Sequence, residues 1–234
     1  MINLCYNYTN MTEKQFVSFL EKKLKENFNF LTKKEIGVGY GIADLVLFKL
    51  NPIKCKIRKS HKQYKKLENE KAFKIFEFLP GAGQRKKADL DYLSRELRIS
   101  KKLLKYKYLK QLLEDKFIKV VDGKYYFKVN GWIPIAKEII AVEAKLKDWK
   151  RGIIQANRYK SFANKTYLAM PTQQGKNIDK KLLKKHNIGL ILFDVDTGKL
   201  TMKNPKKEKA LNKYKANLAT ESILNYKMLC NLSA

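Results

Sequence analysis

The sequence has few cysteines and histidines, and this limits the chemistry available to it. Its three cysteines, Cys5, Cys55 and Cys230, are isolated from one another, and its two histidines are His61 and His186. This spacing supports neither a disulfide framework nor a zinc site, and it suits a reducing compartment. No serine, histidine and aspartate set typical of nucleophilic catalysis is recognisable.

Long apolar runs are also missing. No segment is long enough to span a bilayer, and the residues after Met1 show no signal-peptide pattern, so we expect a soluble, cytoplasmic protein without a membrane partner. The 234 residues, 44% of them hydrophobic, are enough for a buried core and one small second domain. This content argues against wholesale disorder.

Acidic residues are scarce relative to basic ones. Lys and Arg number 51 against 22 Asp and Glu, which gives a formal net charge of +29. A lysine-biased proteome would explain part of this, but such bias normally raises glutamate as well. The depletion of acids therefore indicates a polyanionic partner, and nucleic acid is the natural one.

One of these few acids ends an apolar run. Residues 139–142 have the pattern of a buried strand, and Glu143-Ala144-Lys145 follows directly. Side chains alternate along a strand, so Glu143 and Lys145 point to the same face. Burying them costs desolvation energy unless they pair or meet a metal, and such sites are often functional. The alternative is a strand end that emerges into solvent.

A second acid interrupts another apolar strand pattern. Residues 42–48 follow a glycine-rich turn at residues 37–41, and Asp44 is the only charged residue among them. Two acids and a lysine on neighbouring strands can hold a divalent cation through oxygen ligands, with the ammonium beside a metal-bound water. Asp44 and Glu143 are therefore candidate metal ligands.

A helix is predicted after the second strand. Residues 149–162 have helical periodicity, and Asp148 can cap them. Gln155 and Tyr159 are four residues apart, so they share one helix face. Alone, this pattern is equally typical of an ordinary helix whose Tyr159 packs on a sheet.

These segments resemble, in order, the motifs of the PD-(D/E)XK nuclease superfamily, in the subset that carries a QxxxY motif. Asp44 matches the first acid, Glu143-Ala144-Lys145 matches the E-x-K half, and Gln155 with Tyr159 matches QxxxY. Ala43 replaces the proline that names the motif. The resemblance implies an α/β fold, with a restriction endonuclease-like mixed sheet flanked by helices.

The resemblance also implies roles for these residues. Lys145 would orient or help to deprotonate a water that attacks the phosphodiester in line, while it stabilises charge on the phosphate. The implied cofactor is Mg²⁺, with Mn²⁺ as a substitute. The implied catalytic residues are Asp44, Glu143, Lys145, Gln155 and Tyr159. The implied metal ligands are Asp44, Glu143, the Ala144 carbonyl and Glu13, although Glu13 is also typical of a solvent-facing helix charge.

The remaining core patterns fit an α/β sheet. Thr12 can cap a helix over residues 13–26. A helix is also expected around residues 180–186. Strands are expected at residues 31–38 and 42–48, joined as a hairpin, and then at residues 167–170, 189–195 and 200–202, the last as an edge strand. Alternation of strands with helices indicates the α/β class.

The long segment between the two acids should be a domain of its own. We expect the nuclease-like core at residues 1–60 and 131–203, the insert at 61–130 and a helical tail at 204–234. In the insert, helices are predicted at residues 68–79, at 89–97 and from a Ser100 cap onward, followed by a hairpin around Asp122-Gly123. This order resembles a winged helix-turn-helix (α+β) domain.

In winged-helix domains the third helix usually enters the major groove of DNA. Lysines there bind phosphates as point charges and carry little base information, which predicts affinity without sequence specificity. Winged helices also serve as protein-interaction modules, where lysines simply fill a solvated face. The residues expected to contact DNA are Lys101, Lys102, Lys105, Lys107 and Lys110 in the insert and Arg151 and Arg158 in the core.

The sequence therefore predicts a metal-dependent DNA nuclease, an endonuclease acting on double-stranded or branched DNA at the nucleoid. One alternative is a non-catalytic DNA-binding or regulatory protein on a nuclease fold. Another is a nuclease subunit active only within a larger transposition or restriction assembly. A homodimer would suit the cutting of both strands.

Overall fold

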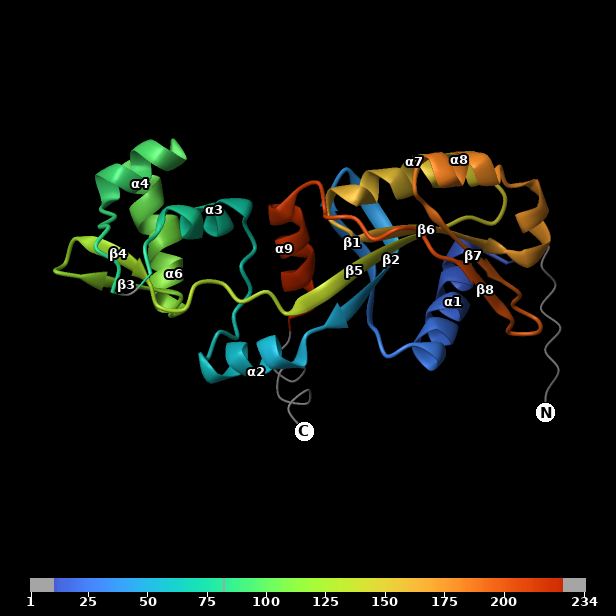
Figure 1. Ribbon diagram of the computed structural model, residues 1–234, viewed down its shortest axis with the longest axis horizontal. Helices are drawn as coiled ribbons and strands as arrows, with labels where there is room; N and C mark the ends of the chain where they lie inside the picture. The colour runs from blue at the N-terminus through green and yellow to red at the C-terminus, as the bar shows by residue number, and fades with distance from the viewer. Residues whose placement is uncertain (1–10, 82, 225–234) are drawn as a thin grey trace. The chain divides into compact units, whose positions relative to one another are not determined.

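The protein divides into two compact units, each made from two separate stretches of the chain. The computed structural model describes residues 11–81 and 83–224. Unit 1 comprises the chain up to Leu50 together with Ala136–Ala219, and unit 2 comprises Asn51–Ile135 with the chain from Thr220 onward. Unit 2 is thus inserted between two strands of unit 1, as the colours of Figure 1 show.

The insert begins and ends outside the predicted limits of residues 61–130. Residues 52–60, which were expected within the core limits, form helix α2 (Pro52–Ser60) in unit 2. The side chain of Asn51 caps α2 by accepting the N–H of Lys54. The predicted tail is divided as well, because α9 (Lys213–Ser222) begins in unit 1 and its end belongs to unit 2. Residues 225–234 of that tail, with Cys5 and Cys230, lie outside the described residues.

Unit 1 is an α/β unit built on a mixed six-stranded sheet in the order β1-β2-β5-β6-β7-β8. The pairs β5–β6 and β6–β7 are parallel, and the other pairs are antiparallel. The predicted hairpin at the start and the predicted edge strand at the end are confirmed. The strands are β1 (Leu31–Gly39), β2 (Gly41–Leu50), β5 (Ala136–Ala144), β6 (Lys165–Pro171), β7 (Gly189–Phe193) and β8 (Leu200–Lys203).

Helices cover both faces of this sheet (Figure 1). Helix α1 (Glu13–Asn27) lies on one face, and the predicted Thr12 cap forms a capping box with Gln15. Helices α7 (Trp149–Arg158) and α8 (Lys180–Lys185) lie on the other face. The short 3₁₀ segments are η3 (Tyr159–Ser161) and η4 (Thr172–Asn177). Because both faces are covered, the C-terminal part of β5 is buried, so a charge placed there is buried too.

A glycine allows α7 to approach the sheet closely. A Cβ atom on Gly152 would lie 2.5 Å from Cδ1 of Leu168 and 3.0 Å from Cγ of Lys145. Glycine inside a helix is destabilising by roughly 0.5–1 kcal/mol relative to alanine. Its presence is explained by this contact, which also packs the stem of Lys145 under the helix.

Unit 2 contains helices followed by an antiparallel hairpin, in the predicted order. After α2 come α3 (Glu70–Phe78), α4 (Leu90–Leu97), α5 (Lys101–Leu103), the π-helical segment η2 (Leu104–Leu109), α6 (Lys110–Glu114), β3 (Ile118–Val121) and β4 (Tyr125–Lys128). Asp122 and Gly123 have φ angles of 55° and 62°, which suit the tight turn predicted for this pair. The π-helical segment was not predicted. No described helix has the length and apolar character needed to cross a bilayer.

A buried ion pair closes unit 2. Arg58 is 0% exposed, and its Nη1 and Nη2 lie 2.6 and 2.9 Å from the two carboxylate oxygens of Glu221. Glu221 also accepts the indole N–H of Trp132 and the backbone N–H of Leu67. Arg58 donates further hydrogen bonds to the backbone carbonyls of Gln63, Lys65 and Ile133. The pair therefore joins α2, the segment that follows α2, the segment that precedes β5, and the end of α9.

We expect Arg58→Met to lower the free energy of unfolding by about 3–5 kcal/mol, because it leaves the Glu221 carboxylate buried without its partner. The double variant Arg58→Met/Glu221→Leu should recover part of this loss, since no buried charge remains. Urea unfolding of the wild type, both single variants and the double variant measures the coupling. If the double variant lost as much stability as the two single variants together, the coupling would be contradicted.

Candidate active site at the end of strand β5

Glu143 is buried near the end of β5. It is 1% exposed, so the alternative of a strand end that emerges into solvent is wrong. Its Oε1 lies 2.8 Å from Nζ of Lys145, and its Oε2 accepts a hydrogen bond of 2.5 Å from the hydroxyl of Tyr159. Both carboxylate oxygens thus have partners, which offset part of the cost of burial.

Asp44 lies beside Glu143 on the neighbouring strand. Strands β2 and β5 pair with Leu45 opposite Val142, and one further step in this register places Asp44 opposite Glu143. Oδ2 of Asp44 accepts the backbone N–H of Ala144 at 2.8 Å. Burial raises the pKa of both carboxyl groups above their ordinary values, and the charge of Asp44 adds to the rise for Glu143, while the charges of Glu13 and Glu35 add to the rise for Asp44. A cation at this place would therefore be favoured.

The ammonium group of Lys145 is the cation that these oxygens meet in this structure. Its Nζ lies 2.8 Å from Glu143 Oε1, 3.1 Å from the Ala144 carbonyl and 3.2 Å from Glu13 Oε2. Burial favours the neutral amine, but the hydrogen bond and charge of Glu143 and the charge of Glu13 outweigh it and raise the pKa of Lys145. The side chain is therefore protonated at neutral pH.

The donor set fits a hard divalent cation. Within the described residues, no group of three or more His, Cys, Asp or Glu side chains is placed to bind a metal ion. The carboxylates of Asp44 and Glu143 and the carbonyl of Ala144 are nevertheless oxygen ligands of the kind that Mg²⁺ prefers, and Glu13 adds a fourth. Three of these residues already direct oxygens at one cation, the ammonium of Lys145.

Tyr159 reaches the site from the α7 side, and Gln155 lies on the same helix. The hydroxyl of Tyr159 contacts Glu143 and, at 2.7 Å, the backbone carbonyl of Ile42. Burial and the charge of Glu143 raise the pKa of Tyr159, so its hydroxyl remains a neutral donor. One helical turn earlier, Oε1 of Gln155 is buried and has no hydrogen-bond partner among the described residues. The shared face was predicted, but the contact between Tyr159 and Glu143 was not.

The predicted DNA-contacting residues are exposed in both units. Arg151 and Arg158 are exposed on α7 of unit 1, and the five lysines are exposed on the helical stretch of unit 2. Lys101 pairs with Asp91 at 2.7 Å, and Lys110 lies 3.9 Å from Glu114. Within the described part of the chain, Lys102, Lys105 and Lys107 have no ion pair.

A cavity of about 570 Å³ opens beside Glu13. Asp148 at the start of α7 lines it, together with Gln173 and Gln174 from η4. The two glutamines are candidate residues for contact with a bound molecule, and the sequence did not predict them. A signal for them existed, because β5 and β6 are parallel and polar side chains that follow β6 must lie at the same sheet edge as Lys145.

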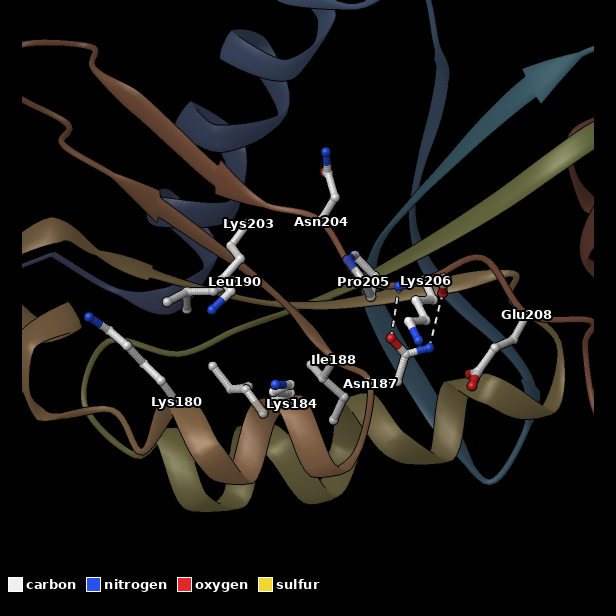
Figure 2. A pocket seen from close by; sticks show the side chains of 11 residues that line it. Lys180, Lys184, Asn187, Ile188, Leu190, Lys203, Asn204, Pro205, Lys206 and Glu208 are labelled. Carbon is white, nitrogen blue, oxygen red and sulfur yellow. Dashed lines mark hydrogen bonds between the residues drawn. The ribbon is translucent and has the colours of Figure 1, made fainter.

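A second cavity, of about 550 Å³, lies between α8 and the strands β7 and β8. Its lining side chains are drawn in Figure 2. Its rim carries Lys180, Lys184, Lys203 and Lys206, none of which forms an ion pair within the described residues. The side chain of Asn187 exchanges two hydrogen bonds, of 3.0 and 2.8 Å, with the backbone of Lys206 and fixes one side of the rim. No predicted site residue lines this cavity, and its rim adds to the positive charge of unit 1.

No protein-family model, curated protein or solved structure matches this chain. The case for a function therefore depends on the geometry of Asp44, Glu143, Lys145 and Tyr159.

We expect Tyr159→Phe to lower the free energy of unfolding by about 1.5–3 kcal/mol, because it leaves an oxygen of the buried Glu143 carboxylate without its donor. Tyr167→Phe is the matched control, since the Tyr167 hydroxyl donates to Asn204, which is exposed and can bond to water instead. Its loss should be below about 1 kcal/mol. If urea unfolding gave equal stability losses for the two variants, the contact with Glu143 would contribute no more than an exposed hydrogen bond.

Proposed function

We propose that unit 1 is a metal-dependent DNA nuclease of the PD-(D/E)XK type, with a restriction endonuclease-like core. The observation that carries this proposal is the convergence of Asp44, Glu143 and Lys145 on one sheet edge. The side chain of Asp44 is hydrogen-bonded to Ala144, 100 positions later in the chain. Burying acids costs desolvation energy even when they are paired, and such costly groups cluster at functional sites.

The residues divide the chemistry among them. Asp44, Glu143 and the Ala144 carbonyl would hold Mg²⁺, or Mn²⁺ as a substitute, with Glu13 as an additional oxygen donor. When bound, such an ion supplies a water activated for attack and neutralises charge on the phosphate. Lys145 remains an ammonium and stabilises the negative charge that develops on the phosphate during in-line attack. This refines its expected role, since a protonated lysine is a poor base.

The α7 side chains support this arrangement. Tyr159 holds one oxygen of Glu143, so that the other oxygen faces Lys145. The unpartnered Oε1 of Gln155 is a buried acceptor able to position a water or a polar group of the substrate. Arg151 and Arg158, exposed on the same helix, are suited to phosphate contacts.

We further propose that unit 2 is a winged helix-turn-helix domain that binds DNA. Three features support this: the order of α3, α4, the helical stretch over residues 101–114 and the β3–β4 hairpin, the bridge between Gly81 and Lys128, and the five exposed lysines of that stretch. Together with the net charge of +29, they favour nucleic acid over protein as the partner. Such a protein would act at the nucleoid, in the cytoplasm.

One observation favours a second candidate, a nuclease that is active only within a larger DNA-processing assembly. The ammonium of Lys145 already neutralises the oxygens of Glu143 and Glu13. A partner or the substrate would then have to draw Lys145 away before a metal could bind. A non-catalytic DNA-binding protein would bind DNA without any response to Mg²⁺.

The nuclease proposal is tested with supercoiled plasmid, linear duplex and branched DNA, in Mg²⁺ or in chelator. Asp44→Asn and Glu143→Gln should each lower cleavage at least a hundredfold, because each removes a metal-binding charge, while DNA affinity is retained. Glu138→Gln is the matched control, since Glu138 is an acid of the same strand that pairs with Lys165. Wild-type cleavage by both site variants, or cleavage in chelator, would refute the proposal.

The lysines of the helical stretch in unit 2 should set the salt dependence of DNA binding. Replacing Lys102 and Lys105 with Gln should make the slope of log K against log salt shallower by about 2, roughly one unit for each lost phosphate contact. The control replaces Lys54 and Lys56, which are exposed on α2. Fluorescence anisotropy in chelator measures the slope, and an equal change in both double variants would contradict a specific role for this helix.

A further inference from the structure

The tip of the β1–β2 hairpin exposes two large apolar side chains beside the candidate active site. Tyr40 is 73% exposed and Ile42 is 61% exposed, whereas the residues from Leu45 to Phe48 in the same strand are buried. Scattered exposed apolar residues are common on protein surfaces. These two are close neighbours at the start of the strand that carries Asp44, and this placement calls for an explanation.

The backbone connects this tip to the site. Ile42 precedes Asp44 by two residues in β2, so both side chains emerge on the same face of the sheet. The hydroxyl of Tyr159 contacts both the carbonyl of Ile42 and the carboxylate of Glu143. One tyrosine thus fixes the position of the hairpin tip relative to the acid.

The tip is also held in a defined conformation. Gly41 has a φ angle of 110°, which a residue with a side chain rarely adopts. The Nζ of Lys215, on α9, lies 4.2 Å from the ring centroid of Tyr40. A Cβ on Gly39 would lie 3.1 Å from the same Nζ, so Gly39 leaves the space that this ammonium occupies. One face of the ring therefore carries a cation.

We propose that the tip of this hairpin is a wedge for nucleic acid, in which Ile42 separates a base pair and Tyr40 stacks on the exposed base. Exposed bases stack on aromatic side chains without regard to sequence, and apolar side chains inserted at a base step unstack it. The Lys215 ammonium attracts the adjoining phosphate. This inference rests on the proposed nuclease function and specifies its substrate: DNA with unpaired bases at the cut site, such as a flap or a branch.

A fluorescent base tests the wedge without cleavage. A flapped duplex carries 2-aminopurine in the last base pair before the junction, and binding is followed in chelator, so that no strand is cut. The probe is placed in each strand in turn, and the wild type should raise the fluorescence in the strand whose base Tyr40 does not cover, because separation of this pair removes the stacked neighbour of the probe. Tyr40→Ala and Ile42→Ala should abolish most of the rise and weaken the preference for flapped over fully paired DNA by about tenfold.

The matched control is Ile53→Ala, which truncates an isoleucine 70% exposed on α2 in unit 2 and should behave as the wild type. All substituted side chains are exposed, and circular dichroism checks that each variant is folded. A wild type that gives no rise, or site variants that give the full rise, would overturn the wedge.

Cleavage assays separate this outcome from failure of the nuclease proposal. A rise that depends on Tyr40 and Ile42, without cleavage under any condition, would retain the wedge and reject the nuclease. Metal-dependent cleavage with no preference for flapped DNA would retain the nuclease and reject the wedge.

Discussion

The burial of one carboxylate constrains much of unit 1. Glu143 is 1% exposed, so water cannot solvate its charge, and the protein must supply partners from several elements. Lys145 directly follows the same strand, Tyr159 comes from the end of α7, and Asp44 lies on the adjacent strand. Gly152 lets α7 come near enough for this contact. Helix α7 and strands β2 and β5 are thus packed so that each supplies a neighbour to the Glu143 carboxylate.

Local signals in the sequence predicted the elements well. Thr12 and Asp148 are confirmed as helix caps, and Asp122-Gly123 makes the expected tight turn, because each depends on residues a few positions apart. The strand pattern around Asp44 and Glu143 was informative for the same reason: a charge within an apolar run is visible without knowing the fold. Their proximity was inferred from a resemblance and is present in the structure.

Features that depend on distant partners were missed. The signals for α2 were present, with Asn51 as cap and Pro52 in the first turn, but no helix was predicted there. Only Glu221, at a separation of 163 positions, explains why Arg58 is buried. The π-helical segment η2 has no recognisable code in sequence, and the contact of Tyr159 with Glu143 depends on how closely α7 packs on the sheet. Packing distance is not encoded in periodicity.

The insertion has a consequence for the order in which the protein is made. Chains are synthesised from the N-terminus, and domains generally fold as their residues emerge. Here β2 must wait for β5 across the whole insert, and Arg58 must wait for Glu221. A ribosome-bound chain therefore carries Asp44 long before Glu143 exists. Unit 1 lacks its last strand until translation has passed Lys203, and unit 2 lacks its buried ion pair until translation has passed Glu221. A site divided in this way cannot be assembled until the whole insert and strand β5 have been made, so any activity it has must wait for them.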